Sequence, residues 1–117
     1  MSLAETSDGF LAARAADGDP RAFEVLTRRH GPYLLAFATR LLASPADADD
    51  VVQEALITAW QKLPELREPA RVRSWLSGIV SRGATDRMRA RRAHIPIDAL
   101  EHSGREPAAP EGLGRVS

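Results

Sequence analysis

Two neighbouring stretches of this chain repeat their apolar residues with the spacing of an α-helix and carry opposite charge. The first, DADDVVQEALITAW (residues 47–60), is acidic, and the second, RSWLSGIVSRGATDRMRARR (residues 73–92), is rich in arginine. Apolar residues three and four positions apart form a stripe that a helix must bury against another element. The two stretches therefore predict two packed helices that offer differently charged surfaces to two partners.

The rest of the chain also indicates helices. No segment alternates apolar and polar residues over the length of a strand, and the β-branched residues are scattered. With 117 residues, the chain has room for one domain and one modest core. We predict an all-α fold, a compact bundle of three to four helices with an irregular C-terminal tail.

Turn and capping signals set the predicted ends of the first two helices. The first runs from about Asp8 to Ala16 and ends at the turn signal Asp17-Gly18. The second begins at Asp19, a capping residue, with Pro20 at the first helical position.

Within the second helix, Gly31-Pro32 is expected to break or kink the chain, because proline clashes with the preceding turn. A further apolar run then follows over residues 33–42. The inward stripe before the proline is formed by Phe23, Leu26 and Thr27.

The third helix has the clearest start. Ser44 supplies a capping hydroxyl, Pro45 takes the first position, and Asp47 places a negative charge in the first turn. Its predicted buried stripe consists of Val52, Ala55, Leu56, Ala59 and Leu63.

A second face of this helix carries Asp50, Gln53, Glu54 and Ile57 at helical spacing. Polar groups fix the register of a partner while an apolar residue supplies burial energy, so the face suits a docking surface. From the residues alone, however, an ordinary solvated face is the favoured interpretation.

A connector, PELREPARVR (residues 64–73), leads to a long helix that begins near Val72. Trp75 belongs either to the buried side of this helix or to a ligand platform, and its spacing favours the core. That buried side is predicted to hold Val72, Trp75, Leu76, Ile79 and Gly83, and a polar flank beside it holds Arg71, Gly78, Arg82, Thr85 and Arg89. Guanidinium groups on such a flank fit phosphates, and Gly78 allows close approach.

The charges of the chain are segregated although they sum to zero. Residues 67–92 hold eight arginines against two acids, whereas residues 1–66 and 93–117 are both net acidic. A concentrated positive segment is typical of a surface that binds a polyanion, and the alternative is a solvated helix face.

Enzyme chemistry finds little support in the residues. The chain has no cysteine, and His30, His94 and His102 lack metal-ligand spacing. Asp49 and Asp50 sit at a helix start, where capping explains them. We expect no enzymatic activity, no cofactor and no metal. Without a long apolar run we also expect no membrane association and a cytoplasmic location.

Three segments together resemble region 2 of bacterial sigma factors of the extracytoplasmic-function group, a branch of the sigma-70 family. They are DPRAFEVLTRRHGPYLLAFATRLL, DADDVVQEALITAWQKLPEL and RSWLSGIVSRGATDRMRARR, and the string D-A-x-D-V-V-Q-E over residues 47–54 is the most specific. The resemblance implies a region 2 helical domain over residues 10–93, preceded by an N-terminal tail over residues 1–9.

Residues 94–117, rich in proline and glycine, would form a linker toward an absent region 4 domain. In this family region 4 reads the minus-thirty-five element, so a fragment cut at the linker is expected to bind polymerase and promoter less tightly than a complete factor. Within the linker, residues 95–100 either pack back on the bundle or are disordered.

The resemblance assigns the two charged surfaces to core RNA polymerase and promoter DNA. The third helix would dock on the coiled coil of the largest polymerase subunit, with polar contacts from Asp50, Gln53 and Glu54 and with Ile57 packing beside them. This interpretation replaces the solvated face for these residues.

The connector and long helix would recognise the promoter minus-ten element as a single strand. Residues 65–74 match the loop that traps a flipped base, and binding energy from stacking and edge hydrogen bonds would drive melting without hydrolysis. The candidate DNA-binding residues are Arg67, Arg71, Arg73, Ser74, Arg82 and Arg89.

Arg82 and Gly83 depart from the family pattern of asparagine followed by a large apolar residue. Asparagine reads a base edge, whereas arginine contacts guanine or a phosphate, and we expect Arg82 to bind the backbone. Gly83 is expected to cost about 1 kcal/mol of helix stability relative to alanine.

The alternative function is a helical interaction module that keeps the fold, has lost promoter recognition and mainly binds a protein such as an anti-sigma factor. By resemblance we expect an anti-sigma partner that covers the same surfaces. The two functions differ in whether polymerase binding depends on Asp50 and Glu54.

Overall fold

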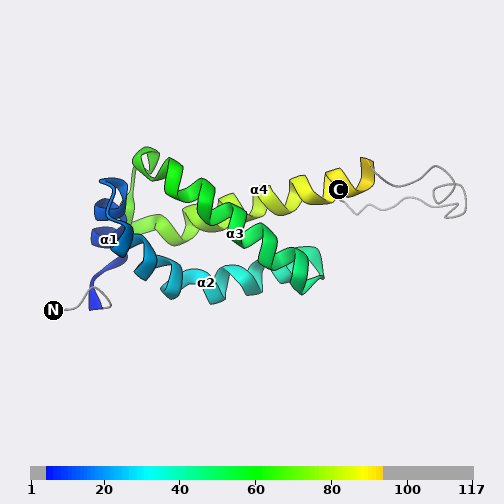
Figure 1. Cartoon of the computed structure of the whole chain (residues 1–117), viewed down its shortest axis with the longest axis horizontal. Coiled ribbons are helices and arrows are strands. Elements are labelled where there is room, and N and C mark those ends of the chain that lie inside the picture. The colour runs from blue at the N-terminus through cyan, green and yellow to red at the C-terminus, as the bar shows by residue number, and fades with distance from the viewer. Residues whose placement is uncertain (1–4, 94–117) are drawn as a thin grey trace, which may run out of the picture. The chain divides into compact units, whose positions relative to one another are not determined.

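The computed structural model describes residues 5–93 of the chain (Figure 1). The described residues form helices and short 3₁₀ turns without any strand, which confirms the predicted all-α fold. In chain order these elements are α1 (Asp8–Ala16), α2 (Pro20–Leu42), α3 (Pro45–Lys62), η2 (Leu63–Glu65), η3 (Pro69–Arg71) and α4 (Val72–Ala93). The predicted tail and the packing of residues 95–100 lie outside the described residues.

Packing divides the chain into two compact units, Met1–Asp86 and Arg87–Ser117, so the boundary falls within α4. The core and the candidate site described below belong to the first unit. Of the second unit, residues 87–93 form the last turns of α4 and are mostly exposed. None of the helices among residues 5–93 is long and apolar enough to cross a membrane.

The helix starts follow the capping signals of the sequence. The side chain of Asp19 accepts a hydrogen bond from Arg21 N at 3.0 Å, and Ser44 Oγ accepts one from Asp47 N at 3.4 Å. Each cap satisfies backbone donors that the helix leaves unpaired, which is worth about 1 kcal/mol. The predicted bounds of the first helix, Asp8–Ala16, are confirmed. The predicted starts of the second helix at Asp19-Pro20 and of the third at Ser44-Pro45 are confirmed as well.

Of the two outcomes predicted at Gly31-Pro32, a break or a kink, the structure contradicts the break, because α2 continues through Pro32 as one helix. Gly31 has no Cβ to clash with the proline ring, which removes part of the penalty on a helical residue before proline. Arg28, whose carbonyl loses the donor that proline lacks, is an exposed residue, so water can satisfy that carbonyl. Buried residues on both sides of Pro32 hold the two halves of α2 in the core.

One hydrophobic core takes residues from all four helices, and eight of its 18 buried apolar residues are alanines. The predicted α3 stripe is buried except for the half-buried Leu56, but the prediction missed Ala48 and Val51. In α2 the buried stripe is Ala22, Leu26, His30, Leu34 and Ala38, while Phe23 and Thr27 are only half-buried.

Helices α3 and α4 approach closely at Gly83. A Cβ placed on Gly83 would lie 3.3 Å from Val51 Cγ1, which is tighter than ordinary van der Waals contact. The glycine therefore lowers intrinsic helix stability but makes room for the side chain of α3.

Asp8 joins α1 to α2. Its carboxylate lies 2.8 Å from Arg29 Nη1 and 2.9 Å from His30 Nε2, and His30 is the buried polar residue among the described positions. Partial burial raises the pKa of Asp8, but the hydrogen bonds from Arg29 and His30 and the positive charge they bring outweigh it. The pKa of this carboxyl therefore lies below its usual value.

Candidate nucleic-acid interface and docking face

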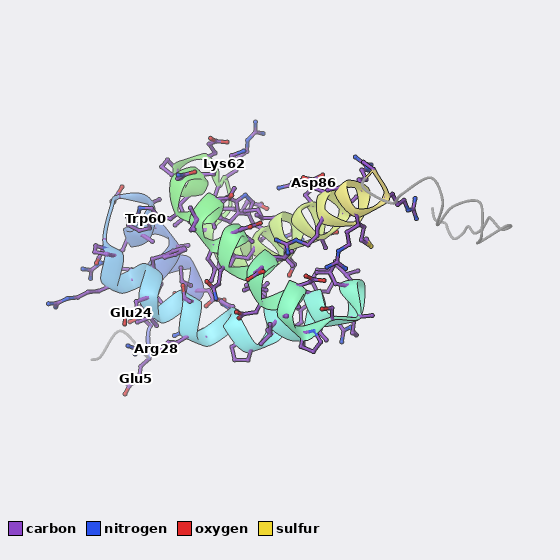
Figure 2. All side chains as sticks on the ribbon, turned by 45° about the vertical axis from the view of Figure 1, so that its right-hand side comes forward. Glu5, Glu24, Arg28, Trp60, Lys62 and Asp86 are labelled. Atoms are coloured by element: carbon purple, nitrogen blue, oxygen red, sulfur yellow. The ribbon has the colours of Figure 1, made fainter. Side chains whose placement is uncertain are left out.

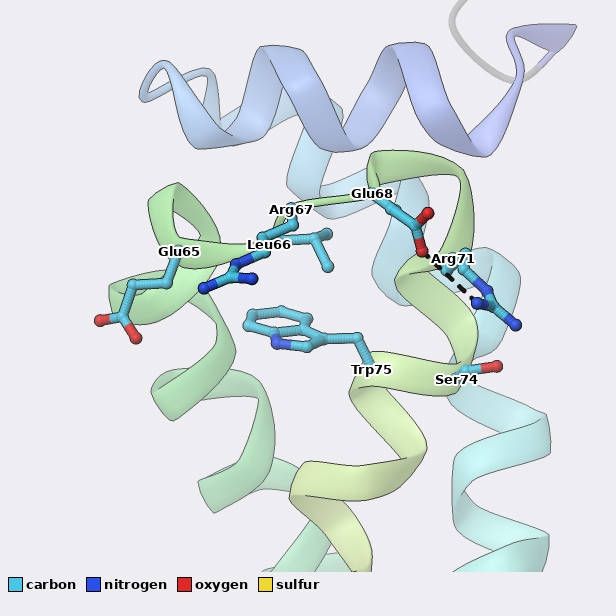
Figure 3. Close-up of a pocket in the computed structure, with 7 residues that line it drawn as sticks. All are labelled: Glu65, Leu66, Arg67, Glu68, Arg71, Ser74 and Trp75. Carbon is cyan, nitrogen blue, oxygen red and sulfur yellow. Dashed lines mark hydrogen bonds and ion pairs between the residues drawn. The ribbon is translucent and has the colours of Figure 1, made fainter.

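The connector between α3 and α4 forms an open cavity of about 750 Å³ (Figure 3). This volume is within the usual range of small-molecule sites, about 300–1,000 Å³. The cavity is lined by Glu65, Leu66, Arg67, Glu68, Arg71, Ser74 and Trp75. Three of the predicted DNA-binding residues, Arg67, Arg71 and Ser74, are thus brought to one place.

Anchors at both ends and the packing of α1 hold the connector. Leu63 and Val72 are buried where it leaves α3 and enters α4, and η2 and η3 contain Pro64 and Pro69, which restrict the backbone. Helix α1 packs on both 3₁₀ turns and lies across the connector in Figure 3. A Cβ on Gly9 of α1 would lie only 3.5 Å from Ala70 Cα, so the two backbones are in close contact.

Trp75 combines the two roles that its sequence position left open. It is half-buried and packs against the hydrophobic core, and it also lines the cavity. Figure 3 shows its indole ring beneath Leu66 and Arg67. A flat aromatic ring that the core holds in place can stack with a planar ligand.

The cavity carries both signs of charge. Arg71 Nη1 lies 3.4 Å from Glu68 Oε1, and both side chains are about 70% exposed, at 72% and 68%. Such an exposed pair contributes about 0–1 kcal/mol to stability, so a ligand that offers Arg71 a phosphate can displace Glu68 at little cost.

Arg73, the next candidate DNA-binding residue, does not line the cavity. Its guanidinium carbon lies 3.8 Å from the centroid of the Tyr33 ring of α2, within the range of a cation–π contact. Tyr33 is exposed and its ring is parallel to that of Phe37, with centroids 6.4 Å apart.

The remaining candidate arginines lie further along α4. Ser74, Gly78 and Arg82 are spaced by four residues and share one side of the helix. Arg82 folds back along this side, because its Nη1 comes within 3.9 Å of the position that a Cβ on Gly78 would take. Arg89 is an exposed residue of the second unit.

The predicted docking face lies on α3. Asp50, Gln53 and Glu54 are exposed, and Ile57 is exposed by 62%, the largest value among the exposed large apolar residues. Gln53 Nε2 donates to Asp49 Oδ2 at 2.9 Å, which orients its side chain on this face.

Trp60, one turn beyond Ile57, adds exposed apolar surface to α3 that the sequence analysis did not select. Its ring centroid lies 5.3 Å from that of Phe23, and Figure 2 shows Trp60 between α3 and the start of α2. Its position three residues after Ile57 was a signal that could have found it.

Other site features had weaker signals in the sequence. Glu65, Leu66 and Glu68 fell within the expected loop but were not assigned roles, and nothing in the sequence connects Tyr33 to Arg73 across 40 positions. Among residues 5–93, no three histidine or acidic side chains are grouped closely enough to hold a metal ion.

Comparison with known proteins shows that the chain is similar to RNA polymerase sigma factors. The family model described as Sigma-70 region 2 matches residues 26–94. The ECF RNA polymerase sigma factor SigM of Mycobacterium tuberculosis is 39% identical over 97 residues, which cover 83% of this chain and 49% of that protein.

Two other relatives show similar coverage. The RNA polymerase sigma factor CnrH of Cupriavidus metallidurans is 39% identical over 86% of this chain and 52% of its own length. The RNA polymerase sigma-H factor of Pseudomonas aeruginosa is 31% identical over 80% of this chain and 49% of its own length. The chain thus spans about half the length of the curated relatives it matches.

Proposed function

The chain belongs to the extracytoplasmic-function group of the sigma-70 family as a region 2 domain, and on this premise we propose that it docks on core RNA polymerase and recognises and melts the promoter minus-ten element. The observation that carries the proposal is the cavity of the connector, where an aromatic floor and arginines meet. The proteins of this family are transcription initiation factors rather than enzymes, so the free energy of binding alone must drive melting of the minus-ten element.

The cavity would hold one base that has left the DNA stack. Trp75 and Leu66 offer apolar surface to the base, Ser74 offers a hydroxyl to its edge, and Arg67 and Arg71 offer guanidinium groups to the flanking phosphates. Removing a base from the duplex costs a few kcal/mol, and stacking recovers about 1–3 kcal/mol per base. Capture of the unpaired base would therefore favour the open state of the DNA over the base-paired state.

Arg73 and Arg82 would continue the DNA path along α4 by contacts with the sugar-phosphate backbone. Arg89, in the second unit, is proposed separately as a residue that contacts the backbone. Arg82 folds back over Gly78 toward the side of the helix that holds Ser74, which supports a phosphate contact near the cavity. Phosphate contacts fix the register of the strand, while the cavity supplies base selectivity.

The exposed face of α3 would bind the coiled coil of the largest polymerase subunit. Asp50, Gln53 and Glu54 would supply polar contacts that steer and align the partner, and Ile57 would be buried on docking. An anti-sigma factor that covers the same face would compete with polymerase. The family model matches residues 26–94. We propose residues 10–93 as the region 2 domain, with residues 1–9 as a tail and residues 94–117 as a linker.

The two-surface proposal is tested with paired variants. The D50A/E54A variant should lose binding to a fragment of the polymerase coiled coil and keep its affinity for single-stranded DNA. The R71A/R82A variant should show the reverse. The slope of its log K against log salt concentration should become shallower by about 0.7 for each phosphate that it no longer binds. Pull-down assays and fluorescence anisotropy over a salt series measure the two affinities.

Glu24→Ala and Arg28→Ala are the matched controls, because these residues form an exposed pair on α2, 2.8 Å apart and outside both surfaces. Neither control should change either affinity. If both double variants weaken both partners equally, the two-surface model is wrong. If the folded chain binds neither coiled coil nor DNA, the interaction module is the better description.

A further inference from the structure

Arg73 is stacked on an aromatic ring from a distant part of the sequence. Tyr33 comes from the middle of α2 and Arg73 from the first turn of α4, and the guanidinium carbon lies 3.8 Å from the ring centroid. The stack covers one face of the ring, and Tyr33 as a residue is still 39% exposed. Two elements of the fold therefore fix the direction of one cation on the surface.

The geometry of a stacked guanidinium leaves its hydrogen bonds available. The five N–H donors lie in the plane of the group, so a ring against its face does not block them. An unrestrained arginine loses side-chain entropy when it binds a phosphate, whereas a stacked one has lost part of it beforehand. Tyr33 thus prepares Arg73 for an anionic ligand.

Arg73 is also placed next to the cavity without being part of it. Its chain neighbour Ser74 lines the cavity, as does Arg71 two residues earlier. Successive helical residues point about 100° apart, so Arg73 faces α2 while Ser74 faces the cavity. A group bound by Arg73 would lie beside the ligand of the cavity and not inside it.

We propose that Tyr33 and Arg73 form a phosphate subsite for the phosphodiester that adjoins the base held in the cavity, with Tyr33 as the positioning residue. This inference rests on the proposed function, because it requires a single strand in the cavity. It adds a residue of α2 to a DNA surface that the sequence places only on the connector and α4.

The test measures binding of fluorescently labelled single-stranded oligonucleotides to the full chain over a salt series. Tyr33→Leu should weaken binding about two- to fivefold at every salt concentration, the range expected from one exposed cation–π contact. The slope of the salt dependence should stay unchanged, because Arg73 keeps its charge. Tyr33→Phe, which keeps the ring, should bind like the wild type.

Arg73 variants separate positioning from direct contact. Arg73→Ala should lower the salt slope by about 0.7, the contribution of one phosphate contact on a single strand. Arg73→Lys, which keeps the charge but cannot stack as a planar group, should lose affinity as Tyr33→Leu does. In the Arg73→Ala variant, adding Tyr33→Leu should cause no further loss, because no cation is left for the ring to position.

Leu35→Ala is the matched control, because Leu35 lies on the same helix and is exposed by the same 39%. It should leave DNA binding unchanged, and thermal unfolding should show that every variant is folded. Three outcomes would each overturn the positioning role of Tyr33. Tyr33→Leu could bind the oligonucleotide as tightly as the wild type, or Tyr33→Phe could lose as much affinity as Tyr33→Leu. Finally, Tyr33→Leu could weaken binding as much in the Arg73→Ala variant as in the wild type. If the wild type binds no oligonucleotide even at low salt, the proposed function fails first and the subsite fails with it.

Discussion

At the scale of single residues, Asp8 shows how one carboxylate links a short helix to a long one. It accepts from both Arg29 and His30, so it satisfies the buried histidine and fixes the N-terminal turn of α1. A buried imidazole that lost this partner would retain an uncompensated polar group, which is costly in a core. The stability of the bundle should therefore depend on the charge of Asp8.

The pH dependence follows from the lowered pKa of Asp8. A carboxyl whose pKa is lower in the folded state contributes stability above its unfolded pKa, and this contribution disappears as pH falls through the folded pKa. Asp8→Asn should be less stable than the wild type at pH 7, by about 1 kcal/mol. The difference should narrow once pH falls below the ordinary value of 3.8.

Urea unfolding of both proteins at pH 7 and near pH 3 measures this difference. Glu24→Gln serves as the comparison, because its exposed pair with Arg28 contributes little at either pH. If the free energy of unfolding differs between Asp8→Asn and the wild type by the same amount at both pH values, the carboxylate charge is not the cause of the difference.

At the scale of elements, α1 acts as the support of the connector. Its buried side chains enter the core, and its Gly9 lies against Ala70 in η3. The cavity is therefore shaped by a helix that contributes none of its lining residues.

Enlarging residue 9 should disturb the cavity and leave the docking face intact. In Gly9→Leu, the side chain would push α1 away from η3 and weaken single-stranded DNA binding severalfold, or about 1 kcal/mol. Binding to the polymerase coiled coil should be unchanged. Ala13→Leu, on the exposed side of α1, is the control and should affect neither. Equal loss of both activities in Gly9→Leu would indicate unfolding instead.

The close approach of α3 and α4 gives a second prediction for an element. Gly78 and Gly83 are both inside α4, but a Cβ at Gly78 meets only the end of Arg82, whereas one at Gly83 meets Val51 at 3.3 Å. Gly78→Ala should raise the free energy of unfolding by about 0.5–1 kcal/mol through helix propensity. Gly83→Ala should gain less or lose stability, because Val51 must move.

Denaturant unfolding of the two alanine variants tests this contrast. Val51→Ala supplies a second check, since removing the obstructing methyls should restore part of the gain at position 83. An equal gain at both glycines would mean that the two helices are not held close together at this point.

At the scale of the whole molecule, local signals were sufficient to predict most elements. Asp19 and Ser44 cap their helices through bonds that span two or three residues, so the sequence alone locates these starts. The break predicted at Pro32 failed because packing along α2 outweighs a local penalty. The Tyr33–Arg73 stack and the contact of Gly9 with Ala70 join residues far apart in the chain, and no local pattern predicts them.

In the candidate site, too, the sequence predicts local segments but not the contacts between distant residues. The resemblance located the connector and the α3 face as linear segments, whereas the cavity depends on how α1 and Trp75 meet the connector in three dimensions. The two proposed surfaces share the core but no side chain. A change to one surface is therefore expected to leave the other unchanged, as the paired variants test.

The alanine-rich core has a consequence for how such a protein can diverge. Eight of the 18 buried apolar residues have only a methyl group as side chain, and a larger side chain at one of these positions would have to displace its packed neighbours. The exposed side chains of the connector, such as Arg67, Glu68 and Arg71, and the outer face of α3 project into solvent and meet no such restriction. If the connector reads promoter DNA as proposed, its exposed residues can change while the interior is inherited almost unaltered, and one scaffold could then serve many promoter sequences.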